Sequence, residues 1–263
     1  MSACLSLRSS LALIPIMGLL CLLPASGDAA SRHEVKTPAV AGEAAPPAAH
    51  AAPGGHGAAG VDPAEALARL KKGNWRFSSA PFSNGKPVAD RRAETGQAQH
   101  PYAVVVGCAD SRTPPELIFD TNLGELFVVR AAGNLLDAYG LGSVEYAVEH
   151  LGCRLIVVLG HERCGALKAA LGAKDAPGHV GALVRDLQGA VTMGRVMPGD
   201  PLVNAIKANA VQIATQIQKE GQFGGAAGEI QVISGYYDLD TGVVEWPGGE
   251  PEDEPAAAAG QGH

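Results

Sequence analysis

The stretch that decides the fold is ELFVVRAAGNLLDAYGLGSVEYAVEHLGCRLIVVLGH, residues 125–161. Two apolar runs, ELFVVRAAG and RLIVVLGH, flank the helix-like segment GSVEYAVEHLG, residues 142–152, which ends in a glycine. Continuous apolar runs are typical of parallel strands that are buried on both faces. A strand, a helix and a second strand in this order predict a right-handed crossover, and therefore an α/β sheet.

The segments on either side extend this pattern. YAVVVGC, residues 102–108, is a third apolar run, and residues 201 to about 219 predict a long amphipathic helix. EIQVISGYYDLDTGVVEW, residues 229–246, predicts a closing hairpin at a sheet edge that turns at residues 240–242. We therefore expect a mostly parallel central sheet flanked by helices, with a hairpin at one edge.

A helical arm is predicted at the N-terminal side of the sheet. VDPAEALARLKKGNWRF, residues 61–77, begins with Asp62 as an N-cap and Pro63 in the first helical position. Glu65 completes the pattern of a capping box. These residues therefore predict an N-terminal helical arm.

The two ends of the chain differ in composition from the middle. Residues 1–30 contain a short apolar stretch followed by small residues, which predicts a cleaved signal peptide and export to the periplasm or the medium. A retained anchor is the alternative. Residues 31–60 are rich in Ala, Gly and Pro and predict a flexible linker, and residues 248–263 predict a disordered acidic tail. The folded domain is therefore expected at residues 61–247.

The charge and composition of the chain argue against some classes of binding partner. The 263 residues carry a formal net charge of -7, and 46% of them are hydrophobic. A negative chain of this kind argues against nucleic acid or an anionic membrane as a main partner of the mature protein.

Two of the predicted strands end in metal-binding residues. Cys108 ends YAVVVGC, His161 ends RLIVVLGH, and Cys164 follows three residues later. In open α/β sheets, ligands bind outside the carboxyl ends of the strands. Two thiolates and one imidazole suit Zn²⁺ and leave a fourth position open, whereas soft thiolates disfavour magnesium, calcium and manganese.

Asp110 has two alternative roles at this site. It lies two residues from Cys108 and two residues from Arg112, so it can bind the metal or pair with the guanidinium. In the first case it closes the zinc site. In the second it leaves room for a water molecule, which the metal ionises to hydroxide, and it can orient that water.

CADSR at residues 108–112 and HERCG at residues 161–165 resemble the motifs of the β-class carbonic anhydrases, of the exported bacterial type. The similarity continues through PPELIFD, GELFVVRAAGN and GYYDLDTGVVEW. The resemblance implies reversible hydration of carbon dioxide to bicarbonate and a proton by a zinc-bound hydroxide. It also implies a homodimer or homotetramer. The implied site residues are the zinc ligands Cys108, His161 and Cys164, the dyad Asp110 and Arg112, and the substrate-orienting Gln99.

Other functions remain open at this point. The same scaffold can hydrolyse carbon disulfide or carbonyl sulfide, and a catalytically silent zinc-binding relative is a further alternative. A redox pair of Cys108 and Cys164 would leave Asp110 and Arg112 without a role. The sequence does not decide between structural and interface roles for Glu116, Arg130 and Asn134.

Overall fold

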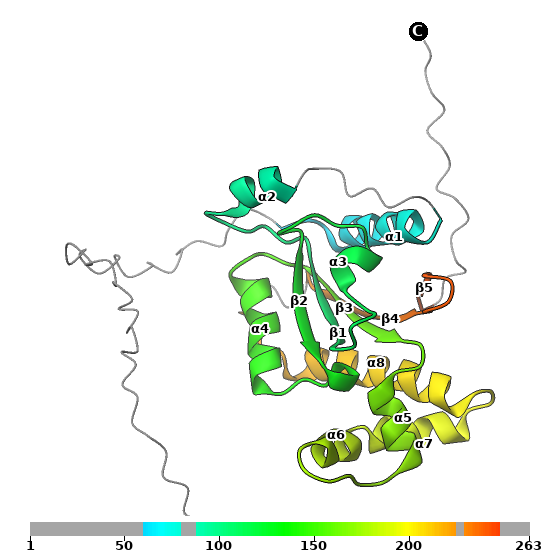
Figure 1. The fold of residues 1–263 in the computed structure, drawn as a ribbon. Coiled ribbons are helices and arrows are strands. Elements are labelled where there is room, and N and C mark those ends of the chain that lie inside the picture. Colours follow the sequence, from blue (N-terminus) through cyan, green and yellow to red (C-terminus); the bar gives the residue numbers. More distant parts are fainter. Residues whose placement is uncertain (1–59, 80–87, 225–228, 248–263) are drawn as a thin grey trace, which may run out of the picture. The chain divides into compact units, whose positions relative to one another are not determined.

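A computed structural model describes residues 60–79, 88–224 and 229–247, and Figure 1 shows their arrangement. The predicted signal peptide, the predicted linker as far as residue 59 and the predicted acidic tail lie outside the described residues. Within the described ranges, no helix is both long enough and apolar enough to span a membrane.

A five-stranded sheet lies at the centre of the described residues, with the strand order β2-β1-β3-β4-β5. Strands β1 to β4 pair in parallel, and β5 pairs antiparallel with β4. This confirms the predicted α/β fold with a mostly parallel sheet. The strands are β1 (Ala103–Cys108), β2 (Leu126–Ala131), β3 (Leu155–His161), β4 (Gln231–Tyr237) and β5 (Val244–Glu245).

Helices cover both faces of this sheet (Figure 1). Helices α4 and α8 pack on one face, α1 and α3 pack on the other, and α5 to α7 lie beyond the carboxyl ends of β1 and β3. The helices are α1 (Pro63–Ser79), α2 (Val88–Thr95), α3 (Pro115–Ile118), the 3-10 turn η1 (Ala132–Asn134), α4 (Ala138–Glu149), α5 (Gly165–Gly172), α6 (Val180–Asp186), α7 (Gln188–Val196) and α8 (Pro201–Glu220).

The central strands β1 and β3 are buried at every position. Successive side chains of a strand point to opposite faces of the sheet. Val104 and Val106 therefore pack in the cluster that includes α4 and α8, whereas Val105 packs in the cluster that includes α1 and α3. Burial on both faces is the physical reason for the continuous apolar runs in the sequence.

Helix α4 begins four residues before the predicted segment, at Ala138. Asp137 caps it there, because its side chain accepts the N–H of Gly140 at 2.9 Å. The helix ends at Glu149, and the predicted glycine stop is present at Gly152, where φ is +74°. The prediction was therefore wrong about the first turn and right about the end.

Helix α1 begins with the predicted N-cap but without the full capping box. Asp62 accepts the N–H groups of Ala64 at 2.9 Å and Glu65 at 3.3 Å. The Glu65 side chain instead binds Arg69, one helical turn further on. An oppositely charged residue at i+4 competes for the glutamate that a capping box would use.

The predicted closing hairpin is divided between the interior and the edge of the sheet. β4 pairs in parallel with β3 along its whole length, and the two-residue β5 forms the edge. The turn between them lies at Asp238–Gly242, where the N–H of Gly242 donates to the Asp238 carbonyl at 3.0 Å. Gly242 has a φ of +77°, which a side chain would strain.

Helix α1 is fixed to the rest of the domain by Gly73 and Asn74. A Cβ atom at Gly73 would lie 1.8 Å from the carbonyl oxygen of Phe119, so no side chain fits there. The buried Asn74 amide donates to the carbonyls of Ile118 at 3.2 Å and Gly242 at 2.8 Å, and its oxygen accepts the N–H of Val244 at 2.8 Å. One side chain therefore joins α1 to both α3 and the β4–β5 turn.

We expect Asn74→Ala to lower the free energy of unfolding by about 2–4 kcal/mol, because it leaves three buried backbone groups without partners. Urea denaturation monitored by circular dichroism measures this change. Asn204→Ala is the control, since Asn204 also bonds to backbone carbonyls but at a partly exposed site. Equal losses in the two variants would contradict the anchoring role of Asn74.

Candidate metal centre

Three predicted ligands meet at the carboxyl edge of the sheet. Cys108 is the last residue of β1, His161 is the last residue of β3, and Cys164 is the N-cap of α5. Because β1 and β3 are adjacent parallel strands, their ends lie side by side. The two sulfur atoms and the imidazole nitrogen lie within 4.8 Å of one another, and all three residues are buried.

The donor atoms of this group fit a zinc ion. Nδ1 of His161 lies 2.9 Å from the carbonyl oxygen of Glu162, to which it can donate a proton. Nε2 is then the nitrogen with a free lone pair, and it is buried without a hydrogen-bond partner among the described residues. A buried nitrogen with a free lone pair beside two thiols is what a zinc site provides. The bond from Nδ1 to the Glu162 carbonyl is the kind of outer hydrogen bond that orients a histidine ligand.

The two thiols have opposite tendencies to ionise. The neighbouring Cys164 thiol, together with the backbone N–H groups that face the sulfur, holds the pKa of Cys108 below its usual range. The same contact between the thiols and burial raise the pKa of Cys164. The N–H of Gly133 also points at Sγ of Cys108, at 3.4 Å. This N–H favours the ionised form of Cys108, and metal binding requires both thiols to lose their protons.

Asp110 pairs with Arg112. The guanidinium donates from Nε to Oδ1 at 2.9 Å and from Nη2 to Oδ2 at 2.8 Å, and the Arg112 N–H donates to Oδ1 at 3.0 Å. These bonds hold the pKa of Asp110 well below its usual range. Of the two roles that the sequence left open for Asp110, the structure has the ion pair, and Asp110 is not among the three grouped ligands.

Arg130, which the sequence left without a role, supports the loop that carries this pair. Its side chain donates from Nε to the carbonyl of Cys108 at 2.7 Å and from Nη2 to the carbonyl of Asp110 at 2.5 Å. The sequence signal that could have revealed this role is the single charged residue within the apolar run FVVRAAG.

Two buried asparagines fix the turn behind Cys108. Asn134, with a φ of +59°, donates to the carbonyls of Val106 at 3.1 Å and Leu159 at 2.7 Å. Asn209 of α8 donates to the carbonyl of Gly133 at 2.7 Å. Asn134 thus has a structural role between β1 and β3, and Asn209 is a supporting residue that the sequence pattern did not reveal.

Gln99 lies in a different place from the ligands of its own chain. It precedes β1 and lines an exposed pocket together with Gln97, Glu116 and Asn122. The described lining of that pocket does not include the three metal-binding residues. The structure therefore does not bring Gln99 to the metal centre within one chain, and its substrate-orienting role stays a prediction.

Cys153 is a buried thiol outside the metal centre. Its sulfur donates to the carbonyl of Pro101 at 3.3 Å, and burial raises its pKa to about 12. Since an unfolded thiol ionises near pH 8.5, the unfolded chain loses this proton first as the pH rises. The stability that the protonated thiol contributes is therefore complete below about pH 8.5 and is lost progressively towards pH 12.

We expect the difference in unfolding free energy between wild type and Cys153→Ala to fall by about 2 kcal/mol between pH 8 and pH 10. Urea denaturation of both proteins at the two pH values measures it, and the variant cancels the contributions of the other titrating groups. A difference that is independent of pH would contradict the raised pKa.

Comparison with known proteins identifies the family. The sequence profile described as carbonic anhydrase matches residues 103–244, which is more than half of the chain and includes all three grouped ligands. The chain belongs to the carbonic anhydrase family. A carbonic anhydrase of Mycolicibacterium smegmatis is 42% identical over 192 residues, which cover 70% of this chain and 93% of the relative.

Solved structures place this family member in the β class. The Coccomyxa β-carbonic anhydrase, solved in complex with acetazolamide, aligns with a TM-score of 0.52 and 28% identity over 60% of this chain and 78% of its own. A β-carbonic anhydrase of Sordaria macrospora, described as tetrameric, shares the fold with a TM-score of 0.54 and 21% identity over 61% of this chain and 90% of its own. The carbonic anhydrase fold and the Cys-His-Cys group therefore occur together in this chain.

Proposed function

We propose that this enzyme catalyses the reversible hydration of carbon dioxide, CO₂ + H₂O ⇌ HCO₃⁻ + H⁺. The observation that carries the proposal is the buried group of two thiols and one imidazole nitrogen, which has no hydrogen-bond partner among the residues that the structure describes, in a chain of the carbonic anhydrase family. The Asp110–Arg112 ion pair follows directly on the strand that supplies Cys108, and it gives the site a carboxylate that the metal does not need as a ligand.

Cys108, His161 and Cys164 would hold the metal. A Zn²⁺ ion bound there supplies a Lewis acid that makes water a nucleophile near neutral pH. Three protein ligands leave a coordination position for water, as catalytic zinc sites require.

The Asp110–Arg112 pair orients the water. Arg112 keeps the carboxylate ionised, so both oxygens remain acceptors at neutral pH. Oδ2 takes one N–H bond from Arg112 and retains acceptor capacity for the O–H of the attacking water. Arg130 holds the carbonyl of Asp110 and so limits the movement of the loop that carries the carboxylate.

The hydrolysis of carbon disulfide or carbonyl sulfide is less well supported than hydration. It would use the same metal centre, but the family profile and the mycobacterial relative are both carbonic anhydrases. A catalytically silent relative is also disfavoured, because the carboxylate and the guanidinium are both present and paired.

Stopped-flow measurement of proton release after mixing the purified protein with carbon dioxide tests the function. We expect rapid hydration by protein that contains about one zinc per chain, as measured by elemental analysis. Fully zinc-loaded protein that does not accelerate hydration would refute the proposal and would direct attention to the sulfur analogues.

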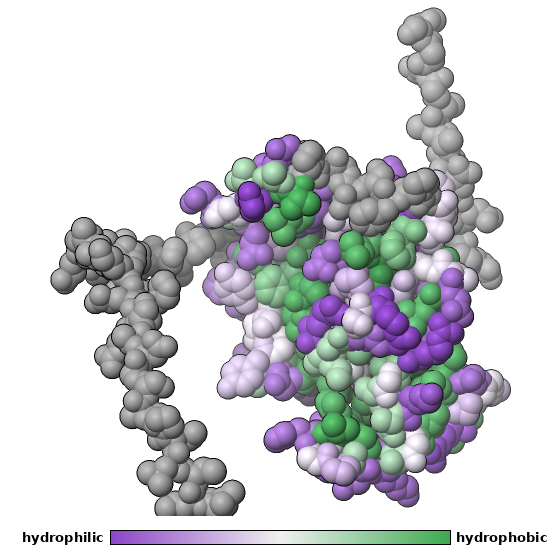
Figure 2. All heavy atoms as spheres, in the orientation of Figure 1, coloured by the Kyte–Doolittle hydropathy of each residue, from purple (hydrophilic) through white to green (hydrophobic). Residues whose placement is uncertain are grey.

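We further propose that the enzyme is a homodimer or homotetramer. Several large apolar side chains are exposed on the single chain, among them Tyr139, Val88 and Val196, with 85%, 66% and 75% exposure. Hydrophobic and hydrophilic residues are interspersed on the face shown in Figure 2. Light scattering coupled to size-exclusion chromatography determines the subunit number, and a monomer at micromolar concentration would contradict the proposal.

Export to the periplasm or the medium is also proposed, on the composition of residues 1–30. N-terminal sequencing of the protein recovered from the periplasmic and culture fractions tests it. We expect a mature chain that begins near residue 28 or 30. Recovery of the uncleaved chain from the cytoplasm alone would refute it.

A further inference from the structure

One of the two residues between the ligands His161 and Cys164 adopts an unusual backbone conformation. Arg163 lies between His161 and Cys164 and has a φ of +52°, in the left-handed region. This conformation is unfavourable for a residue with a side chain, and it persists when the surroundings impose it. The conformation lets the chain turn sharply from the end of β3 into α5, so that His161 and Cys164 reach the same centre.

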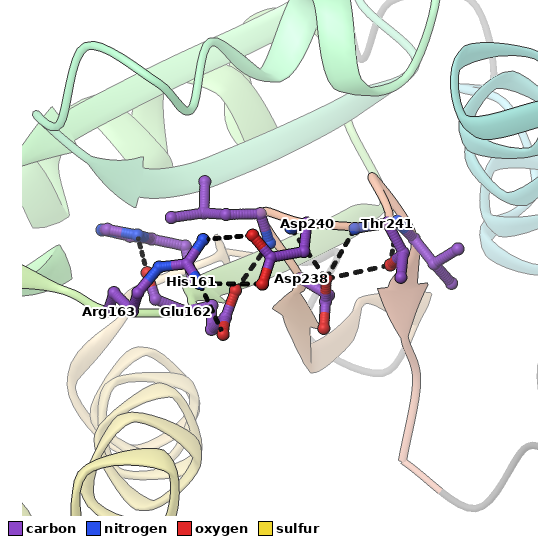
Figure 3. A network of polar contacts seen from close by, with 8 residues as sticks. His161, Glu162, Arg163, Asp238, Asp240 and Thr241 are labelled. Atoms are coloured by element: carbon purple, nitrogen blue, oxygen red, sulfur yellow. Dashed lines mark hydrogen bonds and ion pairs between the residues drawn. The ribbon is translucent and has the colours of Figure 1, made fainter.

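The Arg163 side chain is held by a two-point ion pair. Its guanidinium donates from Nη1 to Oδ2 of Asp240 at 2.8 Å and from Nη2 to Oδ1 at 2.7 Å, as Figure 3 shows. Nη1 also donates to Oε1 of Glu162 at 3.2 Å. A fork of this kind fixes the direction of the guanidinium as well as its distance from the carboxylate.

Glu162 ties the same loop to the same turn. Its N–H donates to the carbonyl of Tyr237 at 2.8 Å, and its Oε2 accepts the N–H of Leu239 at 3.2 Å. Both residues between the ligands His161 and Cys164 are therefore bound to the segment that follows β4.

That segment is itself held by hydrogen bonds within the turn. Oδ1 of Asp238 accepts the N–H groups of Asp240 at 2.9 Å and Thr241 at 2.8 Å, and the Thr241 hydroxyl at 3.0 Å (Figure 3). The next residue, Gly242, is held from α1 by Asn74. Asp240 therefore presents its carboxylate from a turn that is fixed on two sides.

We propose that the Arg163–Asp240 ion pair is a positioning device for the metal centre, which holds His161 and Cys164 in their ligand geometry. The proposal rests on the zinc function proposed above. Neither side chain has to contact the metal or the substrate. The pair acts on the backbone between the two ligands and slows the relaxation of that loop away from the metal.

A positioning role and a general stabilising role predict different effects on global stability and on metal retention. Exposed ion pairs contribute little to folding, so losing this one should barely change global stability. Metal retention depends on the geometry of the ligands, so the same loss should appear in the rate of metal release instead. The Arg185–Asp175 pair is a matched control, because its shortest distance is 2.8 Å against 2.7 Å and its side chains are 59% and 69% exposed against 48% and 69%.

The experiment compares the rate of zinc release to an excess of a chromogenic chelator for the full protein and its variants. We expect Asp240→Ala to release zinc about three- to fivefold faster than wild type, the largest effect that an exposed ion pair allows. Asp175→Ala should stay within about twofold, since its ion pair is of the kind that contributes little. Arg163→Lys should lie between them, because lysine keeps the charge but loses the fork. The exchanged pair Arg163→Asp with Asp240→Arg should recover part of the retention.

The absorption spectrum of the cobalt-substituted protein gives a second readout. Asp240→Ala should shift the sulfur-to-cobalt bands, whereas Asp175→Ala should not. Release rates and spectra that are the same in both variants would overturn the inference while leaving the proposed function intact. Wild-type protein that takes up no zinc would instead refute the proposed function, and the inference with it.

Discussion

Replacing Cys164 by alanine is expected to abolish carbon dioxide hydration, with a loss of at least about 10³-fold in kcat/KM, a small part of the accelerations typical of enzymes. Cys164 provides one of three ligand atoms within 4.8 Å of one another. Two remaining ligands cannot complete a tetrahedral zinc site without additional water, so the zinc content should fall well below one per chain. Stopped-flow assays and elemental analysis of the same preparation measure both effects.

Cys153→Ala provides the control for this experiment. It also removes a buried thiol, but one that bonds to the Pro101 carbonyl and does not belong to the metal-binding group. We expect it to keep its zinc and its activity despite some loss of stability. Retention of full activity and zinc by Cys164→Ala would exclude Cys164 as a ligand.

Asp110→Asn should separate metal binding from catalysis. The substitution keeps the size of the side chain but removes the charge that Arg112 holds and one oxygen that can accept a proton from water. We expect kcat/KM to fall by about 10²–10⁴-fold, the contribution typical of a positioned acid–base group. The zinc content should stay at the wild-type level, because the Asp110 carboxylate is paired with Arg112 and lies outside the ligand group.

Asp175→Asn is the matched variant for this measurement, because it too breaks an arginine–carboxylate pair, at a distance from the site in sequence. Its activity should equal that of wild type. A loss of zinc from Asp110→Asn that parallels the loss of activity would show that Asp110 acts as a ligand, which is the other role that the sequence allowed. Unchanged activity would remove the dyad from the mechanism.

The fold class and the residues that group at the candidate metal site could be predicted from the sequence because both depend on local patterns. Runs such as YAVVVGC and RLIVVLGH carry the signature of strands buried on two faces, and burial of β1 and β3 has that cause. Cys108 and His161 end these runs, so any parallel pairing places them at the same edge of the sheet.

Other parts could not be predicted, because they depend on contacts between distant segments. The order β2-β1-β3 makes Cys108 and His161 neighbours, and nothing in either motif encodes that adjacency. The Arg163–Asp240 pair joins residues 77 positions apart, and the bond of Asn74 to Gly242 spans 168 positions. Local propensity and periodicity carry no information about such pairs.

The sequence by itself thus determined which atoms are available for chemistry: two sulfurs, an imidazole, a carboxylate and a guanidinium near the ends of apolar strands. The tertiary structure decided how they are used. The Asp110 carboxylate pairs with Arg112, Nε2 of His161 is buried without a hydrogen-bond partner in the described part of the chain, and Gln99 lies away from the ligands of its own chain. The physical reason is that a side chain with two possible partners binds the one that the fold brings within reach and shields from water. These distances and this burial are set only when the strands assemble.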